Sequence, residues 1–214
     1  MLKGKKKRSP GVSPESEKSK RFKPVQYQLK IVLLNIDPPV WRRFLIPETI
    51  SLHLLHRVVQ IVMGWGDCHL HQFVFGPDIY ADPEQEPDGE MGKMKNEHRV
   101  LVGDVLSRER SGMTYEYDFG DGWNHRISVE RVLPESDPSR PIVCLEGERA
   151  CPPEDCGGFH GYAEILDIIF NPSHPDYEAM LDWTGRDFNP EVFDLEKVNR
   201  RLNELARAER LIRR

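Results

Sequence analysis

The segment from Tyr115 to Glu130 constrains the fold of this chain more than any other, because its pattern specifies a β-hairpin. Its first part alternates aromatic and polar residues, which is typical of a strand with one buried face. Gly120-Asp121-Gly122 then provides the backbone freedom that a tight reversal needs. An extended pattern starts again at Trp123, so we predict that the segment folds back on itself.

The patterns around this hairpin predict further strands and one early helix. A helix is expected over residues 52–63, because apolar residues recur there at helical spacing between a good N-cap, Ser51, and Gly64. Residues 76–98 are rich in Pro, Gly, Asp and Glu, and we expect a long exposed loop. The other expected strands cover residues 27–36, 40–46, 69–75 and 142–145.

Helical patterns follow the last expected strand, at residues 162–170, at residues 175–181 and from Leu195 onward. Strands therefore concentrate in the first two thirds of the chain and helices in the last third. This order predicts an α+β fold with a mixed, mainly antiparallel sheet built from hairpins, one helix after the first hairpin and a helical C-terminal third. We expect a single such domain over residues 25–206, followed by a basic end at residues 207–214.

Charge is segregated along the chain. Residues 1–24 hold nine Lys and Arg against two Glu, a net charge of +7, and since the whole chain carries −5, the remainder carries −12. The composition of residues 1–24 predicts a disordered basic tail. Such a tail is expected to attract nucleic acid weakly and without sequence preference, whereas an acidic body is not.

The cysteine content and the hydropathy bear on the compartment. The chain has four cysteines and no apolar signal-peptide core after its N-terminal lysines, which indicates free thiols in a reducing cytoplasm. No run of about 20 apolar residues is present, so no membrane span is expected.

Carboxylates gather at the hairpin tip and in a later loop. Asp118 and Asp121 lie at the tip and Glu154 and Asp155 in the loop, and together they are suited to a divalent cation such as Mg²⁺ or Mn²⁺. His125, on the returning strand, is the candidate acid/base of such a site. The alternative is that these carboxylates only hydrogen-bond their own turns and cap the following helix.

Two cysteines and a histidine in the same loop region invite a zinc interpretation. Cys151 is followed by Cys156 and then by His160. Zinc sites typically use a closer first pair and require a fourth ligand, so the spacing favours free thiols over zinc.

Two histidine pairs also share a face of an expected element. His53 and His56 lie three apart on the helix over residues 52–63, and His69 and His71 lie two apart on a strand. A histidine cluster would form if helix and strand pack together, but the pattern favours the alternative, in which polar neighbours satisfy each ring separately.

Several motifs occur along the chain in a fixed order: Pro39-Val40-Trp41-Arg42-Arg43, Met63-Gly64-Trp65, His69-Leu70-His71-Gln72-Phe73, Tyr117-Asp118-Phe119-Gly120-Asp121-Gly122-Trp123 and Cys151-Pro152-Pro153-Glu154-Asp155-Cys156-Gly157-Gly158. This ordered set resembles the plasmid pRiA4b open-reading-frame-three-like family. The resemblance covers roughly residues 25 to 205 and implies an α+β fold without an established activity, although some members carry a resolvase label from mobile elements.

Two functions are compatible with these features. The chain has no Walker-type phosphate loop, dinucleotide fingerprint or nucleophile elbow, which removes the sequence support for the common nucleotide-dependent and acyl-transfer mechanisms. The expected function is therefore a non-catalytic cytosolic module that binds a macromolecular partner, in the setting of plasmid or mobile-element DNA. The alternative is a metal-assisted hydrolase that uses the carboxylates and His125.

Overall fold

The computed structural model of the chain, which describes residues 25–85, 94–107, 109–134 and 142–212, is built on two antiparallel hairpins. The first joins β1 (Val25–Leu33) to β2 (Trp41–Pro47), and the second joins β6 (Gly112–Tyr117) to β7 (Trp123–Pro134). β1 also pairs with β7, so the two hairpins form one continuous sheet. Both hairpins lie where the sequence predicts them.

Helix α1 (Leu52–Met63) packs its apolar side on this sheet, and both of its ends follow from capping chemistry. Ser51 Oγ accepts a hydrogen bond from Leu54 N at 3.1 Å, and the helix stops at Gly64, whose φ of 104° favours glycine. The prediction of a helix over residues 52–63 is confirmed.

The prediction of a long loop over residues 76–98 is wrong for the part of it that the structure describes. β4 (Asp78–Ala81) pairs antiparallel with β3 (His71–Phe75), and β5 (Met94–Asn96) pairs parallel with β4. Two short 3₁₀ helices, η1 (Pro83–Gln85) and η3 (Glu97–Arg99), flank the segment 86–93, which lies outside the described residues. Strands of three and four residues are too short to produce a recognisable period.

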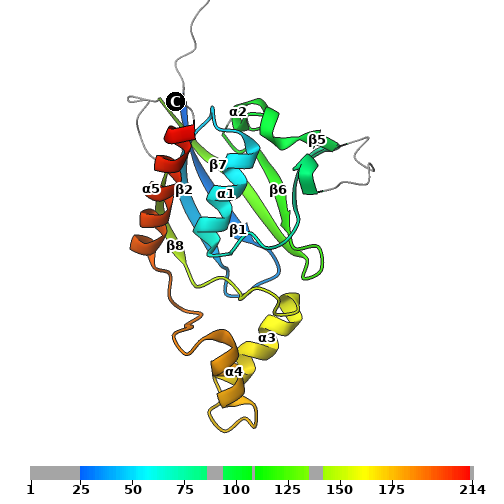
Figure 1. Ribbon diagram of the computed structural model, residues 1–214, viewed down its shortest axis with the longest axis vertical. Helices are drawn as coiled ribbons and strands as arrows, with labels where there is room; N and C mark the ends of the chain where they lie inside the picture. The colour runs from blue at the N-terminus through cyan, green and yellow to red at the C-terminus, as the bar shows by residue number, and fades with distance from the viewer. Residues whose placement is uncertain (1–24, 86–93, 108, 135–141, 213–214) are drawn as a thin grey trace, which may run out of the picture.

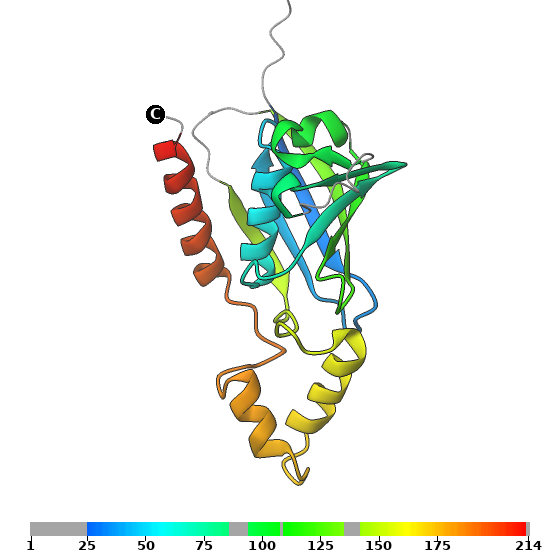
Figure 2. The same cartoon turned by 45° about the vertical axis from the view of Figure 1, so that its right-hand side comes forward.

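The remaining elements follow the predicted order. A short helix, α2 (Val102–Val105), precedes the central hairpin, and β8 (Val143–Glu148) is the last strand. Three helices then complete the chain: α3 (Gly158–Ile169), α4 (Tyr177–Thr184) and α5 (Leu195–Ile212). α5 packs against β8 and α1, whereas α3 and α4 pack on each other beyond one end of the sheet (Figure 2).

The eight strands of the described residues form one sheet in the order β5-β4-β3-β6-β7-β1-β2-β8, with α1 lying across it (Figure 1). Every pairing except β4–β5 is antiparallel, so the predicted α+β class with a mixed, mainly antiparallel sheet is confirmed. Over the described ranges, no helix combines the length and the apolar character needed to cross a membrane. The basic segment 1–24 lies outside these ranges.

Candidate metal centre

The tip of the β6–β7 hairpin and the loop over residues 151–158 meet at the end of the sheet. Asp121 Oδ2 accepts a hydrogen bond from the backbone N–H of Gly157 at 3.1 Å. On the other side of the loop, Trp65 Nε1 donates to the carbonyl oxygen of Pro152 at 3.1 Å. The first bond holds the two carboxylate-bearing segments against one another, and the second fastens the loop to the end of α1.

His69 lies at the centre of the carboxylates that these segments carry. Its Nε2 atom is 3.6 Å from Asp118 Oδ2, 3.8 Å from Glu154 Oε2 and 3.2 Å from Asp155 Oδ1. One ligand atom each from His69, Asp118 and Asp155 lies within 4.8 Å of the other two. We call these four residues, His69, Asp118, Glu154 and Asp155, the His69 cluster.

Glu154 is held by groups that leave one of its oxygens for the cluster. Its Oε1 accepts hydrogen bonds from Gly66 N at 2.8 Å and from the Tyr117 hydroxyl at 3.0 Å. Burial, together with the nearby Glu154 carboxylate, raises the pKa of Tyr117, so this hydroxyl stays protonated and donates. The other oxygen, Oε2, is therefore directed towards His69.

The turn itself positions Asp118. Its Oδ1 accepts from Gly120 N at 3.0 Å and from Asp121 N at 3.2 Å, as the turn-bonding alternative expects, but Oδ2 remains directed at His69. Asp118 and Asp155 both adopt left-handed backbone conformations, with φ of 54° and 56°. Aspartate tolerates this region better than most residues, because its short side chain can bond locally.

The electrostatics of the His69 cluster favour a cation. His69 Nε2 and Glu154 Oε2 are buried and have no hydrogen-bond partner among the described residues. Within the same part of the chain, no Lys or Arg forms an ion pair with Asp118, Glu154 or Asp155. Three carboxylates around one imidazole, with buried atoms left unpaired, provide the ligand set and the negative charge that a divalent cation requires.

Two of the predicted site residues lie elsewhere. Asp121 does not face His69, and its carboxylate instead fastens the loop through Gly157. His125 is fully buried, and its Nδ1 lies 3.2 Å from the carbonyl oxygen of Tyr115. Burial lowers the pKa of His125 to about 4, so the ring is neutral at physiological pH. A ring without access to solvent cannot exchange protons with a substrate there, and we do not assign it the acid/base role.

The zinc interpretation of the loop cysteines receives no geometric support. Cys151 and Cys156 are buried free thiols, and burial raises the pKa of both, that of Cys156 to about 12. His160 is exposed, and its ring is tilted against that of Phe159, with ring centroids 3.8 Å apart. These three residues form no group of convergent ligand atoms in the described ranges.

A cavity of about 360 Å³ adjoins the His69 cluster, and Glu154 belongs to both. Arg42 lines it, but this buried guanidinium already donates to four backbone carbonyls, at 2.7–2.8 Å. The exposed cations of the cavity are Lys197 and Arg201, and neither forms an ion pair within the described part of the chain. Apolar walls are supplied by the rings of Trp65, Phe188 and Phe193.

His69 is the residue that sequence reasoning did not place in this site. The available signal is the His-Leu-His motif, whose two histidines are predicted to share one face of a strand over residues 69–75. In the structure the two histidines lie in different surroundings. His71 stacks on His56 of α1, with ring centroids 3.4 Å apart, whereas His69 precedes β3 and turns to the hairpin tip.

Comparison with known proteins matches most of the chain to a single protein family. The family described as Plasmid pRiA4b ORF-3-like protein matches residues 25–197. The uncharacterized protein y4hQ of Sinorhizobium fredii is 35% identical over 182 residues, which cover 84% of this chain and 91% of that protein. The crystal structure of the protein of unknown function MM3350 from Methanosarcina mazei Go1 superposes with a TM-score of 0.71 and 34% identity, covering 81% of this chain and 97% of that one.

Proposed function

We propose that this chain, which belongs to the plasmid pRiA4b ORF-3-like family, is a divalent-cation-dependent hydrolase of small anionic esters, with the His69 cluster as its metal centre. One observation carries the proposal. A single imidazole nitrogen, His69 Nε2, faces carboxylates from the hairpin tip and from the loop over residues 151–158, at distances of 3.2–3.8 Å. This arrangement supports the hydrolase interpretation over the non-catalytic one.

The ligand chemistry favours a hard cation. Three carboxylates and one imidazole suit Mn²⁺ or Mg²⁺, which take oxygen ligands at about 2.1 Å and keep open positions for water or substrate. A cation in such a site activates a water molecule and polarises the bond that is cleaved. Asp155, whose side chain is 74% exposed, leaves one side of the cluster open to solvent.

The neighbouring cavity supports the choice of substrate class. Lys197 and Arg201, which form no ion pair within the described residues, lie on its wall and are suited to a phosphate or carboxylate group, and the partly exposed ring of Phe188 offers contact for an apolar portion. Because Glu154 belongs to both the cavity and the His69 cluster, a substrate bound in the cavity would lie beside the metal.

Metal binding and turnover are tested on the full chain. After removal of metals by chelation, Mn²⁺ is titrated by calorimetry, and hydrolysis of aromatic phosphate mono- and diesters is measured with Mn²⁺ present. Asp155→Ala and Glu154→Gln are expected to weaken Mn²⁺ binding at least about 10-fold. Removing a residue that only hydrogen-bonds to a metal ligand already has an effect of that size, and these substitutions alter the ligands themselves. Asp167→Ala, at an exposed carboxylate of α3, is the control.

Three outcomes separate the functions. Turnover that requires both Mn²⁺ and Asp155 supports the hydrolase, and Lys197→Ala is then expected to raise KM more than it lowers kcat. Mn²⁺ binding without turnover of any ester overturns the hydrolase in favour of a binding module with a structural ion. Absence of Mn²⁺ binding overturns the metal centre itself.

A further inference from the structure

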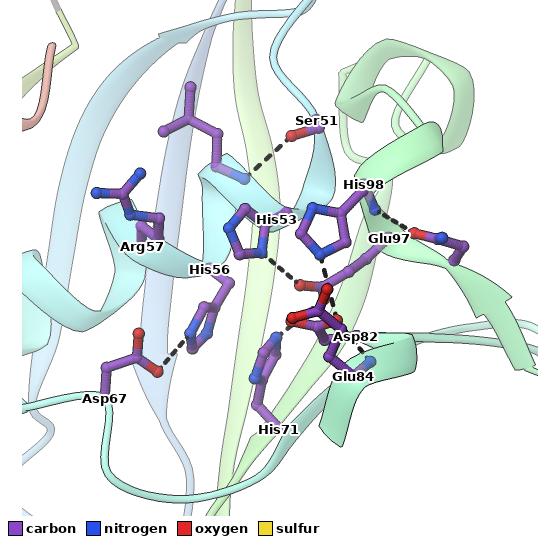
Figure 3. A network of polar contacts seen from close by, with 12 residues as sticks. Ser51, His53, His56, Arg57, Asp67, His71, Asp82, Glu84, Glu97 and His98 are labelled. Carbon is purple, nitrogen blue, oxygen red and sulfur yellow. Dashed lines mark hydrogen bonds and ion pairs between the residues drawn. The ribbon is translucent and has the colours of Figure 1, made fainter. Parts of the chain in front are cut away.

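A second group of convergent ligand atoms lies at the other end of α1. His53 stands in the first turn of that helix, Asp82 follows β4, and Glu97 and His98 form η3. Figure 3 shows these four side chains directed towards one another from separate segments. We call His53, Asp82, Glu97 and His98 the Glu97 cluster; one ligand atom from each lies within 4.8 Å of the others.

The distances in the Glu97 cluster are close to those of a tetrahedral zinc site. His53 Nδ1 is 3.0 Å from Glu97 Oε1, and His98 Nε2 is 3.2 Å from Asp82 Oδ1. Ligands about 2.1 Å from a tetrahedral ion are about 3.4 Å from each other. The rings of His53 and His98 stack with centroids 4.0 Å apart, so both nitrogens reach the same space between the carboxylates.

The carboxylates of the Glu97 cluster are buried and are held in place by hydrogen bonds from groups outside the cluster. Glu97 has no exposed surface, and its second oxygen lies 2.9 Å from Nε2 of the buried His71. Asp82 is 9% exposed, and its Oδ1 accepts from Glu84 N at 2.9 Å. Carboxylate ligands in metal sites are themselves hydrogen-bonded by outer-shell groups that orient them, and His71 and the backbone N–H of Glu84 are such groups here.

No fixed cation of the protein neutralises these two carboxylates. In the described part of the chain, Glu97 pairs only with His53 and His71, and Asp82 only with His98. Burying two carboxylates among imidazoles has a large desolvation cost, which a dication bound to both carboxylates would offset.

We propose that the Glu97 cluster binds one Zn²⁺ ion through His53, Asp82, Glu97 and His98. Two imidazoles and two carboxylates make a four-ligand set suited to zinc, unlike the oxygen-rich His69 cluster. All four positions are filled by protein, so the ion is structural. It fastens the start of α1 to the β4–β5 edge of the sheet, whose strands are too short to be stable alone.

The test uses the metal-free full chain, with Asp155→Ala as a second background in which the His69 cluster lacks one of its ligands. Zn²⁺ affinity is measured by competition with a chromophoric chelator, and the thermal midpoint is recorded with and without Zn²⁺. His98→Ala, at an exposed side chain, is expected to weaken Zn²⁺ binding at least about 10-fold and to remove the rise of the midpoint. Co²⁺ bound by the wild type is expected to give the visible absorption of a four-coordinate site, which His98→Ala abolishes.

His160→Ala is the matched control, because it removes an exposed histidine from the alternative zinc set with Cys151 and Cys156. It is expected to leave Zn²⁺ affinity unchanged. Equal affinity in the wild type and in His98→Ala would overturn the proposal, as would loss of binding in His160→Ala or no Zn²⁺ binding by the wild type. Since His98 is exposed, misfolding of this variant is not expected, and Glu97→Gln provides a second variant at the buried ligand.

Discussion

The carboxylate of Asp121 accepts a hydrogen bond from the backbone N–H of Gly157 at 3.1 Å, although neither residue belongs to the His69 cluster. This bond joins the turn that carries Asp118 to the loop that carries Glu154 and Asp155. The distance between the two halves of the candidate site therefore depends on a pair of residues outside it.

We expect Asp121→Ala to weaken Mn²⁺ binding about 10-fold while it lowers the free energy of unfolding by only about 1 kcal/mol. The physical reason is that the substitution frees the loop without removing a ligand. Calorimetric titration of Mn²⁺ and urea unfolding measure the two effects. Asp121→Asn keeps an acceptor oxygen and is expected to restore most of the affinity, whereas equal weakening in both variants would indicate that the charge of Asp121 acts directly.

Gly158 allows the loop over residues 151–158 to approach the hairpin turn closely at Asp121. A Cβ built on Gly158 would lie 2.5 Å from the carbonyl oxygen of Asp121, and its φ of 68° is unfavourable for a side chain. Gly158→Ala is therefore expected to lower the free energy of unfolding by at least about 2 kcal/mol and to abolish tight Mn²⁺ binding.

Gly185→Ala is the control for Gly158→Ala in urea unfolding, because Gly185 has a φ of 87° but nothing within 4 Å of its Cβ position. This variant tests the backbone conformation without the steric clash, and we expect it to lower the free energy of unfolding by about 1 kcal/mol. If the two alanine variants lose equal stability, the close approach of Gly158 to Asp121 is not what holds the loop.

The burial of His125 predicts a pH dependence of stability. Burial lowers its pKa from 6.5 to about 4, so between these values the unfolded chain binds a proton that the folded chain does not. The contribution of His125 to the free energy of unfolding is therefore fully present above pH 6.5. It is lost as the pH falls towards 4, and the loss amounts to about 3 kcal/mol at the lower limit. Urea unfolding at pH 7 and pH 5 measures the fall.

His125→Phe removes this titration and is expected to show a smaller loss of stability between pH 7 and pH 5 than the wild type. The carboxylates contribute equally to both proteins, so the difference isolates the histidine. His160→Ala, at an exposed ring, is expected to keep the wild-type loss. An unchanged loss in His125→Phe would contradict the assignment of a neutral buried ring.

Much of the fold could be predicted because its signals are local. Ser51 and Gly64 mark the ends of α1 within a few residues of the apolar pattern that they enclose. β4 and β5 escaped prediction because such short strands depend on pairing with partners outside the segment. Trp123, His125 and Ile127 alternate on one buried face of β7, so the same period that predicted the hairpin already directed His125 into the core.

The candidate sites were only half predictable. The carboxylates at the hairpin tip and in the later loop stood out by composition, but their common neighbour, His69, is fixed by a fold that brings three distant segments together. The same holds for Glu97, which sits in a stretch without periodicity and meets His53 only through packing against α1. Such contacts between distant residues arise from the tertiary structure, and no short pattern in the sequence reveals them.

The charge of residues 1–24 leads to a prediction about nucleic acid. Because this segment carries +7 and the remainder −12, we expect weak, sequence-independent binding to duplex DNA that depends on the segment alone. Fluorescence titrations at increasing salt are expected to give a slope of log affinity against log salt no steeper than about −8, since the nine Lys and Arg neutralise about nine phosphates at most.

The decisive comparison replaces the nine Lys and Arg of residues 1–24 by Gln in the full chain. Binding should then be lost at every salt concentration, because the remainder of the chain carries a net charge of −12 and repels DNA. Asp155→Ala serves as the control, since it alters the candidate metal centre and leaves the basic segment intact. If the Gln-substituted chain binds as tightly as the wild type, the contact surface lies on the folded body, and its exposed cations Lys197 and Arg201 become the residues to substitute next.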